Sequence, residues 1–169
     1  MFSAKWCVPA LVLSLAACGG GPAGEPEKAA ETAPEPAAAP PPAPTTPLLY
    51  VTNERAGSVT VVDTGTLDVV TTVPLGKRPR GMAVSPDQSK LYVALSGSPI
   101  AGPGVDEKTL PPADKAADGI GVVDVKTQTL LTILKAGSDP ESVAIGSDGT
   151  QAFTANEDTG QASIIDLAS

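Results

Sequence analysis

The residues best suited to bind an ion or a ligand are charged side chains, and the densest group is the segment KRPR. It places Lys77, Arg78 and Arg80 within four residues of one another. Arginine presents a planar set of donors that matches the two oxygens of a carboxylate or phosphate, so this segment could hold an oxyanion. Three solvated charges on a loop are the simpler interpretation, because exposed charges of this kind contribute little.

A second group of candidates consists of carboxylates between residues 96 and 118. The members are Asp106, Glu107, Asp114 and Asp118. Carboxylate oxygens are the ligands that Ca²⁺ prefers, which makes calcium binding one interpretation. Their spacing matches no calcium-binding loop, however, and a solvated, proline-rich segment is the alternative. We predict no metal site from this group.

The dipeptide Asn-Glu occurs twice, as Asn53-Glu54 and as Asn156-Glu157. These oxygen-bearing side chains could ligate a metal. Asparagine side chains also form hydrogen bonds within turns, and that ordering role is the interpretation that we favour.

Several kinds of chemistry are excluded by residue content. The chain has no histidine, which excludes a Ser-His-Asp triad, histidine base catalysis, imidazole ligation of haem and zinc sites that need histidine. The GIG of residues 119–121 opens a predicted strand rather than a helix, so it is not a dinucleotide-binding turn. A net charge of −8 argues against nucleic acid and anionic lipid as partners. We therefore predict no catalytic residue and no cofactor within this chain.

The candidate residues belong to a repeating sequence, which predicts the elements that position them. Residues 76–94 align with 137–155, and the repeat length is 42 residues, with 19 more in the middle unit. The alignment matches Arg80 with Glu141 at the start of neighbouring repeats. These two side chains could therefore pair structurally.

Each repeat divides into short β-branched segments separated by turn residues. The clearest predicted strands are 48–52, 58–63, 69–75, 81–85, 90–95 and 162–167. Four strands in each period are typical of a β-propeller blade, whose first to fourth strands we label A to D. The chain begins at a B strand and ends at a C strand, which gives ten strands or about two and a half blades. Asp63, Asp124 and Asp166 end the C strands and are expected to bond the turns that follow.

Three segments resemble a known family: YVTN (50–53), SVTVVDTGTLDVVTTVPLGKRPRG (58–81) and SPDQSKLYVA (85–94). They are similar to the YVTN-type β-propeller repeat, and the resemblance covers residues 48–169. It implies an all-β fold of four-stranded antiparallel blades that usually closes a ring of about seven. Residues 96–124 also resemble quinoprotein and haem-d1-like propellers. Because about two and a half blades are fewer than the seven of such a ring, we expect the chain to be a partial or truncated propeller.

In such a meander the connections alternate between two faces. The D-to-A and B-to-C connections share one face, which we call the loop face. It comprises residues 53–57, 76–80, 96–118, 137–141 and 156–160. We call "turn face" the opposite face, where the connections are tight turns. The long irregular segments, including the insert 96–118, all belong to the loop face, so a protein or small-molecule ligand is expected there. The candidate binding residues are Asn53, Glu54, Lys77, Arg78, Arg80, Asp106, Asp114, Asp118, Glu141, Asn156 and Glu157.

The N-terminus matches a bacterial lipoprotein signal. Lys5 precedes an apolar stretch over residues 6–15, which is too short for a helix that spans a bilayer in roughly 20 residues. The following LAAC (15–18) resembles a lipobox. The resemblance implies that residues 1–17 are a signal peptide and that Cys18 carries the lipid. An ordinary secretory signal with an incidental cysteine is the alternative.

The segment after the cysteine predicts a stalk and a location. Residues 19–47 hold nine prolines and eight alanines, a composition that cannot bury a core, so 18–47 is expected to be a lipidated, disordered tether. Gly19 stands where an inner-membrane retention signal has Asp, which favours the outer membrane, with the chain facing the periplasm or cell surface. The only membrane contact expected is the lipid.

The sequence is compatible with two functions. The first is a non-enzymatic binding or scaffold protein of the cell envelope that presents loops to its ligand. The second is a periplasmic propeller enzyme or redox accessory protein, with a metal, quinone or haem site completed by blades outside this chain.

Overall fold

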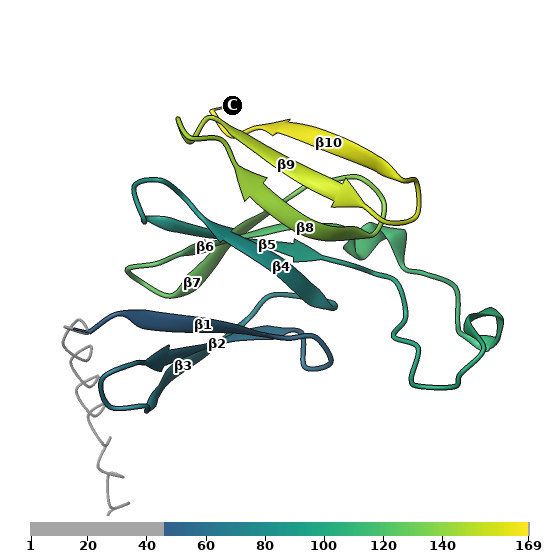
Figure 1. Ribbon diagram of the computed structural model, residues 1–169, viewed down its shortest axis with the longest axis horizontal. Helices are drawn as coiled ribbons and strands as arrows, with labels where there is room; N and C mark the ends of the chain where they lie inside the picture. The colour runs from purple at the N-terminus through teal and green to yellow at the C-terminus, as the bar shows by residue number, and fades with distance from the viewer. Residues whose placement is uncertain (1–45, 169) are drawn as a thin grey trace, which may run out of the picture. The chain divides into compact units, whose positions relative to one another are not determined.

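The ten predicted strands are all present in the structure, which is a computed structural model that describes residues 46–168. Cys18 and residues 19–45 lie outside the described residues. The strands form three antiparallel sheets (Figure 1). Blade 1 is β1 (Leu48–Asn53), β2 (Ser58–Asp63) and β3 (Val69–Pro74); blade 2 is β4 (Pro79–Val84), β5 (Lys90–Leu95), β6 (Gly119–Asp124) and β7 (Thr129–Leu134); blade 3 is β8 (Pro140–Ile145), β9 (Gln151–Asn156) and β10 (Gln161–Asp166). The fold is all-β, with partial propeller-like blades.

Blade 2 is buried on both faces, and this explains the unbroken run of buried residues in β5. On one side Leu91, Val93 and Leu95 pack into a core shared with valines and a leucine of blade 1. On the other side Tyr92 packs into a second core with Val143 of blade 3. Successive side chains of a strand point to opposite faces, so one strand supplies two separate cores.

The end blades expose the side chains that blade 2 buries. Leu49 in β1 is 51% exposed, whereas its repeat equivalent in β5, Leu91, is 4% exposed. Phe153 in β9 is 37% exposed, whereas its equivalent Tyr92 is 4% exposed. Ile164 in β10 is also exposed. Blades 1 and 3 therefore each present an open apolar face that corresponds to a covered face of blade 2.

The A strands of blades 2 and 3 pack side by side, because β4 contacts β8. A Cβ atom at Gly81 would lie 2.8 Å from the Cα atom of Ser142 and 2.9 Å from the carbonyl oxygen of Glu141. Only glycine permits so close an approach. The approach brings the neighbouring Arg80 alongside Glu141.

Aspartates close the turns of the turn face, as the sequence predicted. The carboxylate of Asp63 accepts a hydrogen bond from the backbone N–H of Gly65 at 2.7 Å. That of Asp124 accepts one from the N–H of Thr127 at 2.7 Å. Asp166 accepts a bond from the backbone N–H of Ala168 at 2.8 Å. These contacts hold the chain in tight reversals.

Asp87 plays the same part in the turn between β4 and β5. Its carboxylate accepts bonds from the hydroxyl of Ser85 and from the backbone and hydroxyl of Ser89. The bond from Ser85, followed by those from Ser89, lowers the pKa of Asp87 to about 2. This carboxylate is therefore ionised at any pH near neutrality.

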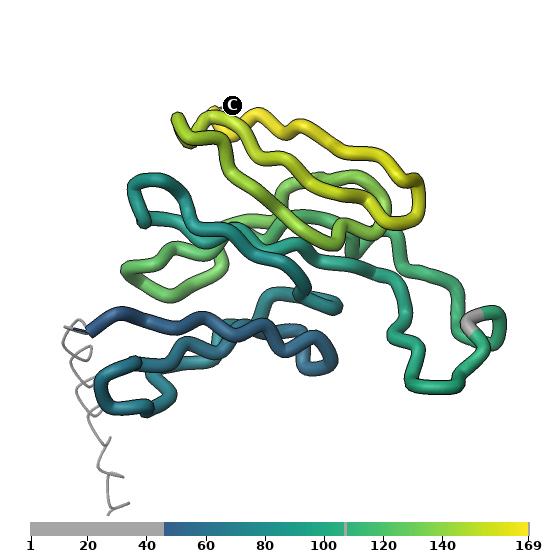
Figure 2. The backbone as a smooth tube through the Cα atoms, in the orientation of Figure 1, coloured from purple at the N-terminus to yellow at the C-terminus, as the bar shows by residue number. Residues whose placement is uncertain are grey.

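The insert 96–118 is the one long connection between strands in the described part of the chain. It leaves β5, runs away from the sheets and returns to β6 (Figures 1 and 2). Two short 3-10 turns, η1 (Glu107–Thr109) and η2 (Lys115–Ala117), are the only helical segments among residues 46–168. No helix in that range is long and apolar enough to cross a membrane.

The core between blades 1 and 2 predicts a large effect for Leu95→Ala. Leu95 is fully buried, so this truncation should lower the free energy of unfolding by about 3 kcal/mol. The matched change Leu131→Ala, at a half-exposed position of β7, should cost less than about 1 kcal/mol. Urea unfolding followed by circular dichroism measures both. Equal losses for the two variants would contradict the described core.

Candidate functional site

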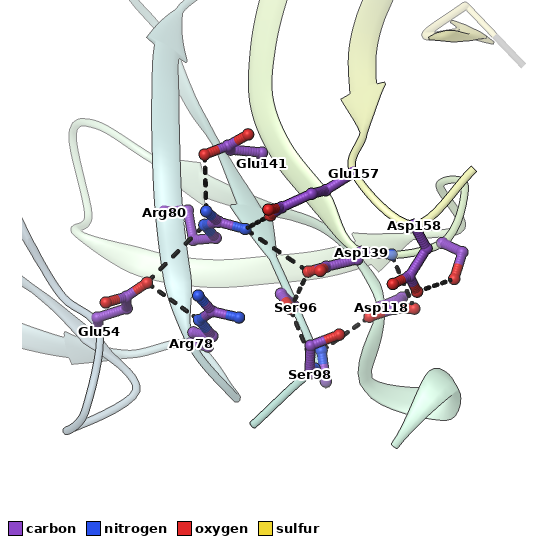
Figure 3. A network of polar contacts seen from close by, with 12 residues as sticks. Glu54, Arg78, Arg80, Ser96, Ser98, Asp118, Asp139, Glu141, Glu157 and Asp158 are labelled. Carbon is purple, nitrogen blue, oxygen red and sulfur yellow. Dashed lines mark hydrogen bonds and ion pairs between the residues drawn. The ribbon is translucent and has the colours of Figure 1, made fainter. Parts of the chain in front are cut away.

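Arg80 lies at the loop-face end of β4, with its guanidinium between blades 2 and 3 (Figure 3). Its Nη2 donates to Oε1 of Glu141 at 2.7 Å, and its Nη1 donates to Oε2 of Glu157 at 2.7 Å. The side chain of Arg80 is only 14% exposed. The pairing of Arg80 with Glu141 that the repeat suggested is present, and Glu157 is a second partner.

Two further carboxylates approach the same guanidinium. Oδ1 of Asp139 lies 3.6 Å from Nη1, and Oε1 of Glu54 lies 3.8 Å from Nε. Burial acts to lower the pKa of Arg80, but the hydrogen bond to Glu157 and the charges of Glu141 and Asp139 outweigh it and raise that pKa. Glu54 belongs to blade 1, and the other three acids belong to blade 3. Arg80 of blade 2 therefore connects all three blades.

Arg78 is also held in this network rather than solvated. Its Nε donates to Oε1 of Glu54 at 3.0 Å, and its side chain is 17% exposed. The interpretation of KRPR as three solvated charges is therefore wrong for Arg78 and Arg80, because the packing of neighbouring blades buries them. Lys77 alone is exposed, at 61%, and its Nζ lies 2.7 Å from Asp114.

Arg78 and Asp139 occupy equivalent positions, each immediately before the proline that opens an A strand. Both adopt the left-handed backbone region, with φ of 44° and 53°. The carbonyl of Arg78 accepts a bond from the N–H of Ser96, and that of Asp139 accepts one from the N–H of Glu157. Because the strained conformation recurs in both blades, it belongs to the way a blade begins. Only the charge of the side chain differs.

Asp139 and Asp118 connect blade 3 to the base of the insert. The buried carboxylate of Asp139 accepts a hydrogen bond from the hydroxyl of Ser96. Asp118 accepts one bond from the N–H of Gly97 at 2.7 Å and another from the N–H of Asp139 at 3.1 Å. With a side chain 4% exposed, Asp118 is a structural anchor, and its interpretation as a solvated residue is wrong.

The insert is closed at its base and fastened to two blades. The N–H of Asp114 donates to the carbonyl of Gly97 at 2.9 Å, and a Cβ at Gly97 would lie 1.7 Å from the carbonyl oxygen of Asp114. Lys77, which follows blade 1, pairs with Asp114. Lys115 pairs with Asp158 of blade 3. The two ends of the insert thus meet, and ion pairs on both sides hold them.

Two clefts on the loop face share the insert as a wall. The first cleft, of about 530 Å³, lies between the insert, the turn 54–57 and residues 76–78. The second cleft, of about 580 Å³, lies between the insert and the acidic residues of blade 3. The residues that line both are Arg78, Ser98, Pro99, Pro111 and Pro112. Volumes of this size are typical of small-molecule sites.

The two asparagines have the ordering role that the sequence favoured. Nδ2 of Asn53 donates to Oγ1 of Thr60 at 2.8 Å, and Nδ2 of Asn156 donates to Oγ of Ser163 at 2.8 Å. Each bond ties the end of a B strand to the following C strand. The adjacent glutamates are then left to face the arginines.

The acids of the insert do not gather into a metal site. Asp106 accepts a bond from the backbone of Lys108, apart from the anchors at Asp114 and Asp118. Among the side chains that the structure describes, no group of three or more His, Cys, Asp or Glu could hold a metal ion.

Three members of the network are absent from the sequence-based candidates: Asp139, Lys115 and Asp158. Asp139 could have been found, because the alignment of repeats places it opposite Arg78. The pairing of Lys115 with Asp158 joins the insert to a distant turn. The insert has no counterpart in the other repeats, so no pattern in the sequence indicates this contact.

The network predicts that Arg80→Gln destabilises the fold. Four carboxylates would lose a shared, mostly buried cation, so the free energy of unfolding should fall by about 2 kcal/mol or more. Lys126→Gln removes one exposed charge on the turn face and should change it by less than about 0.5 kcal/mol. Urea unfolding in low salt and in 1 M NaCl provides the test, and the deficit of R80Q should shrink in high salt as repulsion is screened. Equal free energies of unfolding for R80Q and K126Q would contradict a stabilising role for Arg80.

Comparisons with known proteins support the fold at the level of structure. No family model matches the chain, and no curated protein matches it. Among solved structures, the chain is similar to hydrazine synthase of Kuenenia stuttgartiensis, with 26% sequence identity and a TM-score of 0.57 over 72% of this chain and 30% of that one.

Two further solved structures share the arrangement of strands. A putative 6-phosphogluconolactonase from Bacteroides fragilis is 24% identical, with a TM-score of 0.51 over 69% of this chain and 31% of its own. Dihydro-haem d1 dehydrogenase NirN, in complex with DHE, is 19% identical, with a TM-score of 0.53 over 79% of this chain and 26% of its own. The chain thus spans less than a third of the length of each. These likenesses agree with a β-propeller fold and show no closer family.

Proposed function

We propose that this chain is a binding module whose ligand occupies the loop face beside the insert. The observation that carries the proposal is the pair of clefts that share the insert as a wall, both opening among charged side chains of adjoining blades. The turn face, in contrast, consists of short reversals closed by their own aspartates. Irregular loops on a rigid scaffold are the usual place for recognition.

The ion pairs support a framing role for the network. Arg80, Glu141 and Glu157 are engaged with one another, and Asp118 and Asp139 hold backbone groups or a serine. A polar network whose members are all paired holds its elements in a fixed arrangement, here the walls of the clefts. This arrangement suits a scaffold that presents a preformed surface.

We propose in addition that the module is held at the cell envelope by a lipid on Cys18, with residues 19–47 as the tether. Support comes from the sequence alone, namely the LAAC of residues 15–18 and the proline content of the tether. Gly19 favours the outer membrane, with the blades facing the periplasm or cell surface.

The open apolar faces of blades 1 and 3 support the expectation of further blades. Leu49 and Phe153 are exposed where their equivalents in blade 2 lie beneath a neighbouring blade. Exposed apolar surfaces of this kind mark sites of contact. We propose that blades of the same repeat cover both faces.

A second candidate function is a redox enzyme or accessory protein with a site completed by other blades. The likeness to hydrazine synthase, and to a dehydrogenase named for haem d1, favours it. A stoichiometric metal or haem in the complete protein would support this candidate over a plain scaffold.

The binding proposal is tested by amide chemical shifts of the full chain titrated with short peptides, sugars, amines and carboxylic acids. Shifts should concentrate in residues 76–78, 97–101 and 110–114. The shifts of residues 76–78, which remain in the chain, should disappear when 98–113 are replaced by two glycines, a change that the closed base at Gly97 and Asp114 permits.

The matched control alters the turn face. Gln88 has a φ of 59°, so Gln88→Gly should keep the fold and all ligand-induced shifts. Shifts confined to the turn face, or shifts that survive loss of 98–113, would contradict the proposal.

Anchoring is tested by Cys18→Ser in a Gram-negative host. The native chain should partition with membranes and into detergent, because several acyl chains together bind a bilayer firmly. The C18S chain should keep residues 1–17 and carry no lipid label. Equal lipid labelling of the two chains would contradict the assignment of Cys18.

A further inference from the structure

The guanidinium of Arg78 has unused hydrogen-bond donors, unlike that of its neighbour Arg80. It uses Nε for Glu54, and no other hydrogen bond of its guanidinium exists among residues 46–168. Both terminal nitrogens of Arg80 donate hydrogen bonds to glutamates. Two adjacent N–H donor groups of a largely buried arginine thus have no hydrogen-bond partner among the described residues.

The position of this guanidinium is fixed. The carbonyl of Arg78 accepts the N–H of Ser96, and Glu54 holds Nε at 3.0 Å. Arg78 also lines both clefts. A donor pair held in place at a cleft loses little freedom when it binds a planar acceptor.

The first cleft carries an excess of positive charge in an otherwise acidic protein. Its walls include Arg55, Lys77 and Arg78 against Glu54 and Asp114. Each acid is already paired with one of these cations. Within the described residues Arg55 has no ion pair, so the charge of this wall is not balanced.

The insert lines the first cleft mainly with apolar side chains. It contributes Pro99, Ile100, Pro111 and Pro112, beside Ser98 and Asp114. Proline and isoleucine offer no side-chain donors or acceptors, so they favour a hydrocarbon body over a polar one.

From these features we propose that the first cleft binds a small carboxylate with an apolar body, its two oxygens against the terminal nitrogens of Arg78 and its hydrocarbon part against the proline wall. This inference rests on the proposed binding function and names the ligand class. A planar carboxylate matches the two terminal N–H groups of Arg78. A cationic ligand would be repelled by Arg55, and an alcohol would leave one of the two N–H groups unpaired. Phosphate alone would gain nothing from the apolar wall.

The test is a titration of the full chain with hexanoate, compared with hexanol, hexylamine and inorganic phosphate. Hexanoate should bind saturably and at least tenfold more tightly than each of the other three. Arg78→Lys keeps the charge but removes the fork, so it should weaken hexanoate at least tenfold. Lys126→Gln, on the turn face, should leave the dissociation constant within twofold. Arg55→Gln should weaken binding as well, and it disturbs no ion pair of the described structure.

The outcomes separate this inference from the proposed function. Equal binding of hexanoate and hexanol overturns the inference. So does undiminished hexanoate binding by an R78K chain whose melting temperature equals that of the native chain. If the melting temperature of R78K is lower than that of the native chain, the hexanoate affinity of R55Q decides instead, and an unchanged affinity overturns the inference. Should amines or peptides shift amides beside the insert while hexanoate does not, the loop face remains a binding surface and the carboxylate assignment fails. Should no compound shift them, both fail.

Discussion

The arrangement of the three blades at the loop face depends on one guanidinium, that of Arg80. Packing between blades is apolar along the middle of the strands, where valines and leucines form two separate cores. At the strand ends, the close approach of β4 and β8 brings charged groups of different blades together. A mostly buried cation is tolerated there because it meets acids from both neighbouring blades. Hydrophobic burial provides the attraction between blades, and the ion pairs fix their alignment.

That alignment in turn supports the insert. Asp118 and Asp139 meet at the point where the insert rejoins blade 2 and where blade 3 begins. The insert is therefore anchored to the seam between two blades rather than to its own blade alone. A long segment held in this way can form a wall of stable shape, even though its tip has few contacts with the strands.

The sequence was sufficient to predict every strand and the division into blades, because the repeat shows the same alternation three times. Tyr92 and Phe153, for example, mark the same place in successive B strands. The contact of Arg80 with Glu141 could be predicted for the same reason. The burial of Arg78 could not, because it depends on how closely the blades pack. The anchoring of Asp118 and Lys115 could not either, because the insert has no equivalent against which to compare them.

The opposite charges at equivalent positions also have a consequence for blade order. Arg78 and Arg80 open blade 2, whereas Asp139 and Glu141 open blade 3. If a second copy of blade 2 followed the first, arginine would meet arginine at the seam. Apolar side chains attract one another whichever blade carries them, whereas the ion pairs at the seam require opposite charges on the two blades. In a protein built from similar repeats, this charge pattern favours one order of the blades over another.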